Sequence, residues 1–153
     1  MTGKRGSVVA IEPNTGEILC MVSSPSYNPS LFVGEQRNKS YRDLFLDPNK
    51  PLYDRSTSAL YPPGSIFKLI NALIGLQEDN ITSGTLFKCN EGWNFKSILK
   101  IGCHPHRSPL NLRQSIAQSC NAYFCSTFQS IISSKNSPSI GIDNWAKYAK
   151  SFG

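Results

Sequence analysis

The chain has 153 residues, of which 39% are apolar, so its length and composition suit one domain with a hydrophobic core rather than a disordered segment. The formal net charge is +6, but the basic residues are scattered and have no interleaved aromatic platform, which argues against nucleic acid as a partner. No apolar run approaches the roughly 20 residues of a membrane-spanning helix, and no signal-peptide pattern opens the chain.

Residues 6–23 predict a pair of strands. Gly6–Ile11 and Glu17–Ser23 are short runs rich in β-branched and other apolar residues, and the turn-forming segment Glu12–Gly16 joins them. Both runs are apolar on both faces. We therefore expect both faces of this sheet to be covered, with Cys20 packed in the core.

The rest of the chain divides into a loop region and a helical subdomain. Residues 24–63 contain many prolines and glycines and predict a long loop with one short helix near residues 41–45. Residues 64–153 predict the helical subdomain, interrupted by an irregular or weakly stranded segment at residues 83–110. Its first helix carries a wide apolar stripe, formed by Ile66, Leu69, Ile70, Leu73, Ile74 and Leu76.

Three further helices are predicted toward the end of the chain. Asn111 is expected to cap a helix over residues 112–118, and a break at Ser119 leads into a second apolar helix with Cys125 packed in the core. Asp143 is expected to cap the last helix. The buried face of that helix is formed by Trp145, Tyr148, Ala149 and Phe152.

Ser65 and Lys68 are the first candidate for chemistry. Residues three apart share one face of a helix, and a serine at a helix start feels the positive end of the helix dipole. Gly64 removes side-chain bulk beside Ser65, and a lysine among apolar groups has a lowered pKa that suits it as the base for a serine hydroxyl. The same spacing also fits an ordinary capping serine and a solvated lysine.

The segment Ser119-Cys120-Asn121 is the second candidate. A serine and an asparagine one residue apart on a short connection can both point into a cleft, although an ordinary helix linker has the same composition. The order of the two elements is more specific. Penicillin-binding proteins and active-site-serine β-lactamases carry Ser-x-x-Lys, then Ser-x-Asn, then Lys-Thr-Gly.

The surrounding residues resemble one branch of that superfamily. Tyr61–Lys68 resembles the nucleophile motif of class B penicillin-binding proteins, and Val9–Leu19 resembles the opening strands of their transpeptidase domain. Asp47–Arg55 resembles the lead-in segment of the elongation-specific branch, penicillin-binding protein 2. Tyr148–Gly153 resembles the helix end that follows the second motif, so the resemblance covers residues 6–153.

This resemblance implies an α/β (α+β) fold of the penicillin-binding protein and serine β-lactamase type. Residues 1–153 would form the N-terminal part of a transpeptidase domain, with helices packed on an antiparallel sheet. Neither Lys-Thr-Gly nor Lys-Ser-Gly occurs in the chain, so we expect it to stop before the strand that carries this motif. The chain alone is then expected to be weakly active or inactive.

The resemblance also implies roles for four residues. Ser65 would be acylated by the D-alanyl-D-alanine end of a peptidoglycan stem peptide or by a β-lactam antibiotic, and Lys68 would act as the general base. Ser119 would pass a proton to the leaving amine, and Asn121 would hold the substrate amide. The implied location is the periplasmic face of the inner membrane, with an anchor outside this chain and partners in the cell-elongation machinery.

Two other functions stay open at this point. A D,D-carboxypeptidase or β-lactamase of the same fold would release the acyl group with water rather than with an amine. A non-catalytic β-lactam sensor or wall-binding scaffold would keep the acylation without turnover. The context of Tyr61–Ser65 and the segment 48–55 favour the transpeptidase.

Cysteine and histidine residues suggest a metal site. The chain has five cysteines, and this odd number argues against a fully paired disulfide framework. Cys89, Cys103, His106 and Cys120 form the preferred zinc ligand set, with His104 as the substitute, because zinc favours thiolate and imidazole ligands. Some members of the elongation-specific branch resemble this in carrying a metal near the active site. A Cys89–Cys103 disulfide and free thiols are the alternatives.

Overall fold

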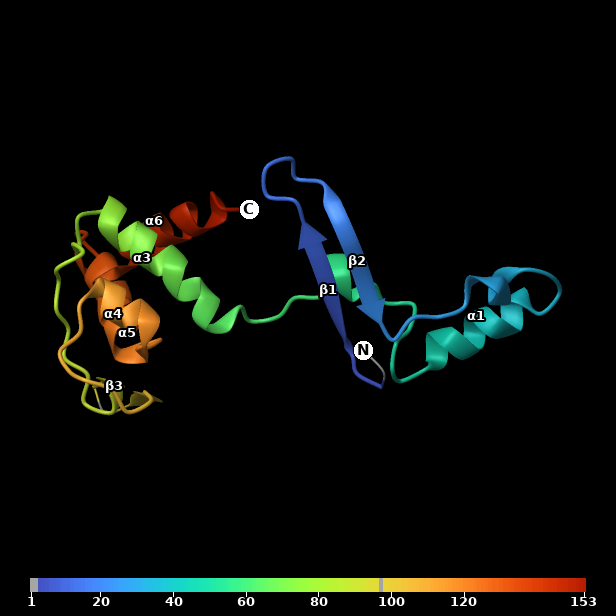
Figure 1. The fold of residues 1–153 in the computed structure, drawn as a ribbon, viewed down its shortest axis with the longest axis horizontal. Helices are drawn as coiled ribbons and strands as arrows, with labels where there is room; N and C mark the ends of the chain where they lie inside the picture. The colour runs from blue at the N-terminus through green and yellow to red at the C-terminus, as the bar shows by residue number, and fades with distance from the viewer. Residues whose placement is uncertain (1–2, 97) are drawn as a thin grey trace. The chain divides into compact units, whose positions relative to one another are not determined.

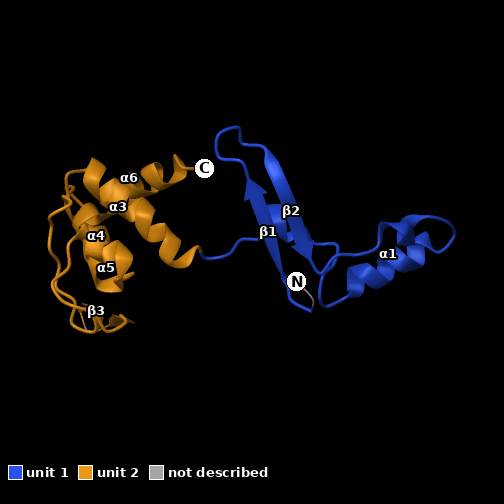
Figure 2. Cartoon of the chain, viewed as in Figure 1, with its two compact units in different colours: residues 1–62 blue, residues 63–153 orange. Residues whose placement is uncertain are grey.

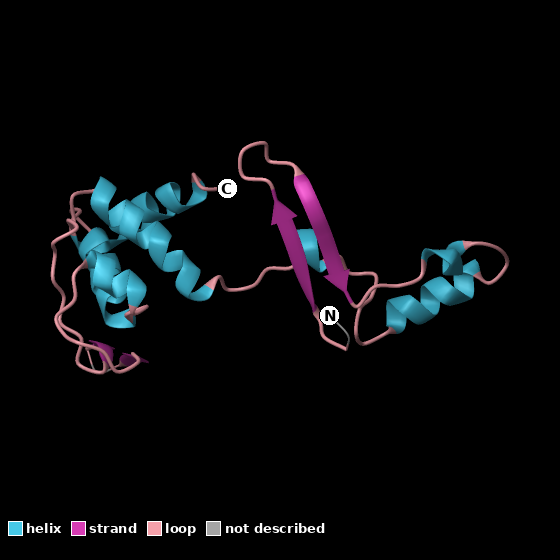
Figure 3. Cartoon of the chain, in the orientation of Figure 1, coloured by secondary structure: helices cyan, strands magenta, loops and turns pink. Residues whose placement is uncertain are grey.

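The computed structural model describes residues 3–96 and 98–153, and the chain divides into two compact units (Figure 2). The first unit, residues 1–62, contains a strand pair and short helices, and the second, residues 63–153, is mainly helical (Figure 3). In the described part of the chain, no helix has both the length and the apolar character that crossing a membrane requires.

The first unit is built on an antiparallel strand pair, β1 (Gly6–Ile11) and β2 (Ile18–Ser24) (Figure 1). The expected cover on both faces is not seen, because Val8 is 49% exposed and Leu19 is 68% exposed. Cys20 is exposed as well, so its predicted place in the core is wrong. Two strands alone cannot bury both of their faces, and a sheet that is apolar on both sides needs a packed layer on each.

The segment predicted as a loop contains three short helices: η1 (Pro29–Phe32), α1 (Arg37–Leu46) and α2 (Arg55–Ser58). Helix α1 is longer than the expected helix near residues 41–45. Arg55 is only 6% exposed, and its guanidinium donates hydrogen bonds to the carbonyl groups of Asn49, Lys50 and Tyr53. Its backbone N–H donates to Ser23 Oγ on β2, and this hydrogen bond connects the loop region to the strand pair.

The second unit begins with a short 3-10 turn, η2 (Gly64–Ile66), which leads into helix α3 (Phe67–Gln77). The segment predicted as irregular or weakly stranded contains a hairpin whose two short strands pair antiparallel. The elements that follow α3 are β3 (Gly92–Phe95), β4 (Leu99–Gly102), α4 (Leu112–Ala117), α5 (Asn121–Ser133) and α6 (Pro138–Lys150).

The core of the second unit lies where α5 packs against α3 and α6. Tyr123 on α5 is fully buried, and its hydroxyl donates a hydrogen bond of 3.2 Å to the Thr85 carbonyl. Two glycines let the helices approach closely. A Cβ on Gly75 would lie 2.9 Å from the Thr127 side chain, and one on Gly141 would collide with the backbone of Ile132. The candidate site lies on this packed group of helices.

Helix α6 starts six residues earlier than predicted. Its cap is Ser137, whose side chain accepts a hydrogen bond from the Ile140 N–H, and Pro138 occupies the first turn. Asp143 lies inside the helix, so its predicted role as a cap is wrong. Trp145 does pack inward, with ring centroids 5.7 Å from Phe67 and 5.2 Å from Phe128. By contrast, Asn111 caps α4 in a complete capping box, as predicted.

Candidate active site

Lys68 connects the two predicted motifs. It is the second residue of α3, and its Nζ donates to the Ser119 carbonyl oxygen at 2.6 Å and to Ser119 Oγ at 2.9 Å. The amine also lies 5.9 Å from the ring centroid of Phe124. Burial lowers the pKa of Lys68 below the usual lysine value, although nearby thiol groups oppose this shift. A lysine with a lowered pKa is easier to deprotonate and therefore better suited to act as a base.

Ser65 lies in the turn that precedes α3 rather than in the helix itself. Gly64 has a φ of +66°, and beyond its two chain neighbours no described atom lies within 4 Å of the position a Cβ would take. The glycine therefore suits this position by its backbone conformation, and the predicted removal of bulk beside Ser65 stays a prediction. Ser65 and Lys68 line the same two cavities, but the hydrogen bonds of Lys68 Nζ go to Ser119 and not to Ser65.

Ser119 and Asn121 flank the start of α5. Ser119 has a φ of +49°, a left-handed conformation that a serine seldom adopts, and its carbonyl and hydroxyl oxygens both accept from Lys68. Such backbone strain persists only where the surroundings hold it, and it is often found at functional sites. Asn121 Nδ2 donates a hydrogen bond of 2.7 Å to the Gly102 carbonyl, which ties the start of α5 to the end of β4.

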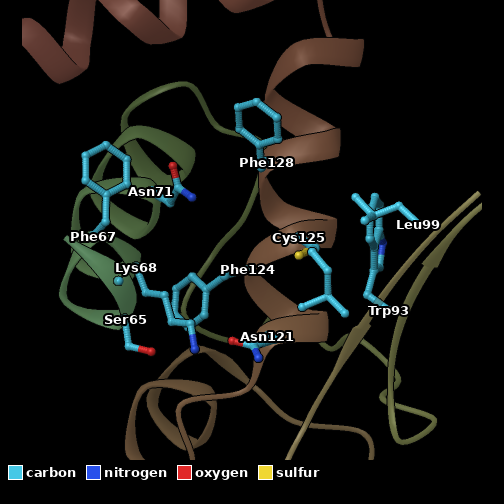
Figure 4. Close-up of a pocket in the computed structure, with 12 residues that line it drawn as sticks. Ser65, Phe67, Lys68, Asn71, Trp93, Leu99, Asn121, Phe124, Cys125 and Phe128 are labelled. Atoms are coloured by element: carbon cyan, nitrogen blue, oxygen red, sulfur yellow. The ribbon is translucent and has the colours of Figure 1, made fainter. Parts of the chain in front are cut away.

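The cavity beside these residues has a volume of about 530 Å³. Figure 4 shows Ser65, Lys68 and Asn121 following one another along one edge, with the aromatic side chains of α3 and α5 above them. Ser119 lines a smaller cavity of about 220 Å³ that also reaches Ser65 and Lys68. The four predicted catalytic residues are thus brought into one region, although they come from two distant segments of the chain.

The four predicted zinc ligands also meet. The ligand atoms of Cys89, Cys103, His106 and Cys120 all lie within 4.8 Å of one another, and the two Sγ atoms of Cys103 and Cys120 are 4.0 Å apart. His104 is exposed and does not belong to the group. None of these cysteines forms a disulfide in the described residues, so the alternative Cys89–Cys103 bond is not present.

His106 is oriented as a metal ligand would be. Its Nδ1 makes a hydrogen bond of 2.7 Å with the Arg107 carbonyl oxygen, and its Nε2 is buried without a hydrogen-bond partner. The Arg107 carbonyl raises the pKa of His106 because it accepts a hydrogen bond from the ring N–H. A histidine that donates one ring N–H to a carbonyl has its other nitrogen free for a metal.

The three thiols differ in how easily they lose a proton. Burial raises the pKa of Cys89 to about 12 and also raises that of Cys120. Burial acts against ionisation of Cys103 too, but the Ala122 N–H and the neighbouring Cys89, His106 and Cys120 lower the pKa of Cys103 below its usual value. Like charges that crowd together without a cation keep the three thiols from ionising together, and their pKa shifts therefore differ in direction.

Some residues of the cavity were not predicted as site residues. Cys125, predicted to pack in the core, is half-buried and lines the cavity between Phe124 and Phe128. Trp93 and Leu99 of the hairpin line its other wall. The apolar residues at positions 93, 95, 99 and 101 were the available signal, in a segment that the sequence predicts as irregular or weakly stranded.

The sequence matches the family described as penicillin binding protein transpeptidase domain over residues 6–153. Among curated proteins, the peptidoglycan D,D-transpeptidase MrdA of Acinetobacter baumannii is 34% identical over 160 aligned residues, which cover 100% of this chain and 22% of that protein. The peptidoglycan D,D-transpeptidase PbpA of Mycolicibacterium smegmatis is 36% identical over 78% of this chain and 26% of its own length. The chain therefore spans about a quarter of the length of these relatives.

Solved structures of penicillin-binding proteins also match this chain. A penicillin-binding protein (PBP2) from Helicobacter pylori has a TM-score of 0.79 and 27% identity, over 98% of this chain and 27% of that one. The penicillin G acyl-enzyme complex of penicillin-binding protein A from M. tuberculosis has a TM-score of 0.77 and 29% identity, over 97% of this chain and 34% of that one. These matches confirm the resemblance indicated by the motifs and the mixed helix and strand fold that it implies.

Proposed function

Because this chain belongs to the penicillin-binding protein transpeptidase family, we propose that it forms part of a peptidoglycan D,D-transpeptidase in which Ser65 carries the acyl group. The observation behind the proposal is the Lys68 amine, which is hydrogen-bonded to Ser119 and lines the same two cavities as Ser65. The names of the relatives and the acyl-enzyme complex with penicillin G support this reading.

In the first step, Ser65 Oγ attacks the carbonyl carbon of the penultimate D-alanine of a stem peptide. Lys68 accepts the hydroxyl proton, and its lowered pKa favours the neutral amine that this requires. The C–N bond to the terminal D-alanine breaks, and the proton returns to the leaving nitrogen through Ser119, which is within hydrogen-bond distance of Lys68. Asn121 holds the amide of the donor peptide.

In the second step, an amine of a neighbouring stem peptide attacks the ester on Ser65. The amine loses a proton to Lys68, the new amide bond forms, and the Ser65 oxygen leaves and takes back its proton. A β-lactam follows only the first step, because its leaving nitrogen stays attached to the acyl group. The antibiotic therefore keeps Ser65 blocked.

The proposal is tested by identifying the acylated residue. The full-length gene product is treated with a fluorescent penicillin, digested and analysed by mass spectrometry, and we expect the adduct on the peptide that contains Ser65. Ser65→Ala should remove the label, whereas Ser139→Ala, on an exposed position of α6, should keep it. Labelling that survives Ser65→Ala would reject Ser65 as the nucleophile.

The product distinguishes a transpeptidase from a hydrolase of the same fold. With a D-alanyl-D-alanine peptide and an added amine such as D-methionine, we expect the amide product to exceed the free acid. Free acid alone, at every amine concentration, would point to a carboxypeptidase instead. Acylation without any release of product would point to a sensor.

We also propose that the 153 residues react weakly by themselves. They contain no Lys-Thr-Gly motif, which in this family supplies part of the oxyanion hole and the clamp for the substrate carboxylate. The rate of labelling by penicillin should be at least about a hundredfold lower for these residues alone than for a protein that also carries the motif. Equal rates would contradict this part of the proposal.

We further propose that the cysteine and histidine cluster holds a zinc ion. With Zn–S bonds of about 2.3 Å, tetrahedral geometry places two sulfur ligands about 3.8 Å apart, close to the 4.0 Å between Cys103 and Cys120. The buried, unpartnered Nε2 of His106 fits a metal ligand as well. The ion would order the segment that contains Cys89 and Cys103. It would supply structural stabilisation rather than a step in the reaction.

Metal analysis of freshly purified protein tests the zinc proposal. We expect about one zinc per chain, and less than about 0.2 per chain would reject it. His106→Ala should lower the zinc content strongly. The matched variant His104→Ala should retain it, because His104 is exposed and outside the cluster. A similar loss in both variants would mean that the selected ligand set is wrong.

The substrate of a transpeptidase lies outside the cytoplasm, and we therefore propose that the protein works at the periplasmic face of the inner membrane. We also propose that it acts with proteins of the cell-elongation machinery. Protease added to cells with a permeabilised outer membrane should digest the protein. Complete protection, with the inner membrane intact, would contradict this location.

A further inference from the structure

The β3–β4 hairpin has one entirely apolar face. Trp93 pairs with Ile101 and Phe95 pairs with Leu99 across the two strands, and paired residues point to the same face of a sheet. Gly92 opens the hairpin with a φ of +145°, and a Cβ there would collide with the Ile101 carbonyl. The hairpin thus gathers four large apolar side chains on one side, in a segment that is otherwise rich in polar residues.

This apolar face forms a wall of the cavity that contains Ser65. Trp93, Leu99 and Ile101 line the cavity together with Ser65 and Lys68. Figure 4 places Trp93 and Leu99 on the side of α5 opposite to Ser65, with Cys125 and Asn121 between the two sides. A ligand joined to Ser65 and extending past Asn121 would therefore meet this wall.

The wall is formed before any ligand arrives. The Trp93 ring stacks on Phe95 with centroids 5.7 Å apart and planes at 18°, and it also packs against the hydrophobic core. The hydrogen bond from Asn121 Nδ2 to the Gly102 carbonyl joins the hairpin to the start of α5. A preformed surface loses little conformational freedom when a ligand binds, so its contacts contribute more to affinity.

The polar groups of the cavity are concentrated at one end. Ser65, Lys68 and Asn121 lie along one edge, and the Oδ1 of the remaining asparagine, Asn71, already accepts a hydrogen bond of 2.8 Å from Trp145 Nε1. A cavity with a polar edge and an apolar wall fits a ligand whose reacting end is polar and whose other end is not.

We propose that the hairpin wall is the subsite for the acyl side chain of the donor, and that Trp93 makes the enzyme prefer an aromatic or alkyl group there. This inference rests on the proposed function, because it takes Ser65 as the acylated residue. The side chain would be attached through the amide that Asn121 holds, and it would lie against the indole. Donors without such a side chain would react through the same groups but would gain nothing from the wall.

Two penicillins that differ only in this side chain test the proposal on the full-length gene product. Benzylpenicillin carries a phenylacetyl group on its side-chain amide nitrogen, and 6-acetamidopenicillanic acid carries an acetyl group on the same nitrogen. Both react by the same step: Ser65 Oγ bonds to the lactam carbonyl carbon, the ring C–N bond opens, and the ring nitrogen receives the proton. The measured quantity is the ratio of the two second-order acylation rates.

Trp93→Ala should lower this ratio by roughly tenfold, the loss expected for one aromatic contact. Trp93→Phe, which keeps a ring, should recover at least about half of the loss on a logarithmic scale. Ile98→Ala is the matched control, because Ile98 is 83% exposed in the same hairpin and does not line the cavity. A ratio unchanged by Trp93→Ala would overturn the proposal.

A binding measurement separates this proposal from the proposed function. In Ser65→Ala, which cannot be acylated at that residue, phenylacetyl-D-alanyl-D-alanine should bind about tenfold more tightly than acetyl-D-alanyl-D-alanine. Trp93→Ala in the same background should abolish the difference, and equal affinities with Trp93 present would reject the subsite. If neither penicillin acylates Ser65, the proposed function fails. The affinities of the two peptides still test whether the hairpin wall binds the side chain.

Discussion

The turn at residues 119–121 has two sides, and they are held by different means. On one side, Ser119 accepts two hydrogen bonds from Lys68, and Asn121 borders the cavity with Ser65. On the other side, Cys120 is 1% exposed, and its Sγ lies 4.0 Å from that of Cys103. One short segment therefore takes part in both the proposed reactive site and the cysteine and histidine cluster.

This difference shows what each side depends on. The catalytic side has short, charge-assisted hydrogen bonds that form without any added group. The cysteine side has long sulfur contacts, an unpartnered imidazole nitrogen and thiols with opposed pKa shifts, all of which a cation would improve. We therefore expect the catalytic groups to be sensitive to the cysteine side, while the metal should be insensitive to the catalytic groups.

The largest effect is expected from Lys68→Ala. Without the amine, Ser65 has no neighbouring base, and the rate of penicillin acylation should fall about a thousandfold. The zinc content should stay the same, because Lys68 belongs to the catalytic side alone. Stopped-flow acylation and metal analysis on the same preparation measure both. Lys147→Ala, an exposed lysine on α6, is the control, and zinc lost together with activity would contradict the separation of the two sides.

A smaller effect on the reaction is expected from the cysteine side. Cys103→Ser should remove most of the zinc and slow acylation by about 10- to 100-fold, because Cys120 then no longer fixes the start of α5. The control is Cys20→Ser, an exposed thiol in the other unit. Normal acylation in a zinc-free Cys103→Ser protein would show that the two sides are independent.

The two sides also differ in how far the sequence predicts them. Ser65 and Lys68 share one turn of chain, and their order with Ser119-Cys120-Asn121 was enough to select them. The contact between Lys68 and Ser119 spans 51 residues and depends on how α3 packs against α5, which no spacing rule contains. The cysteines and His106 could be selected by residue type, but only the folded hairpin region brings their ligand atoms within 4.8 Å.

The predictions for Asp143 and Cys20 were wrong because each relied on a local sequence signal alone. Asp143 was chosen as a cap because it precedes an apolar face, yet Ser137 followed by Pro138 is the stronger start signal and begins α6. Cys20 lies in an apolar strand, but whether such a strand is covered depends on other elements and not on its own composition. Both errors arose because a stronger neighbouring signal or another element, and not the residue's own type, decided the outcome.

A third prediction concerns Tyr123 on helix α5, the helix that follows the turn. Tyr123 donates its backbone N–H to Cys120 Sγ at 3.3 Å and its hydroxyl to the Thr85 carbonyl at 3.2 Å. Tyr123→Phe removes only the second bond and should reduce the free energy of unfolding by roughly 0.5–1.5 kcal/mol. Urea unfolding measures this loss. Zinc content and acylation rate should not change, and a change in either would mean that the core also sets the geometry of the turn.

The smallest effect is expected at the far end of α3, away from both sides. The Lys135 ammonium lies 2.5 Å from Glu78, and hydrogen bonds from Lys135, then Tyr148 and Asn144, hold the pKa of this carboxyl below its usual value. A lowered carboxyl pKa adds stability above the unfolded-state pKa of about 4.3, and this stability is lost as the pH falls further.

Glu78→Gln should therefore cost a few tenths of a kcal/mol in the free energy of unfolding at pH 7, as expected for a pair whose lysine side chain is 36% exposed. The cost should shrink as the pH falls below about 4, because the wild-type carboxyl is then protonated too. Urea unfolding at several pH values measures the difference, with Asp143→Asn on the exposed face of α6 as the control. A cost that grows toward acid pH would reverse the sign expected here. Altered acylation or zinc content would show that Glu78, which lies away from the turn at residues 119–121, also influences that turn.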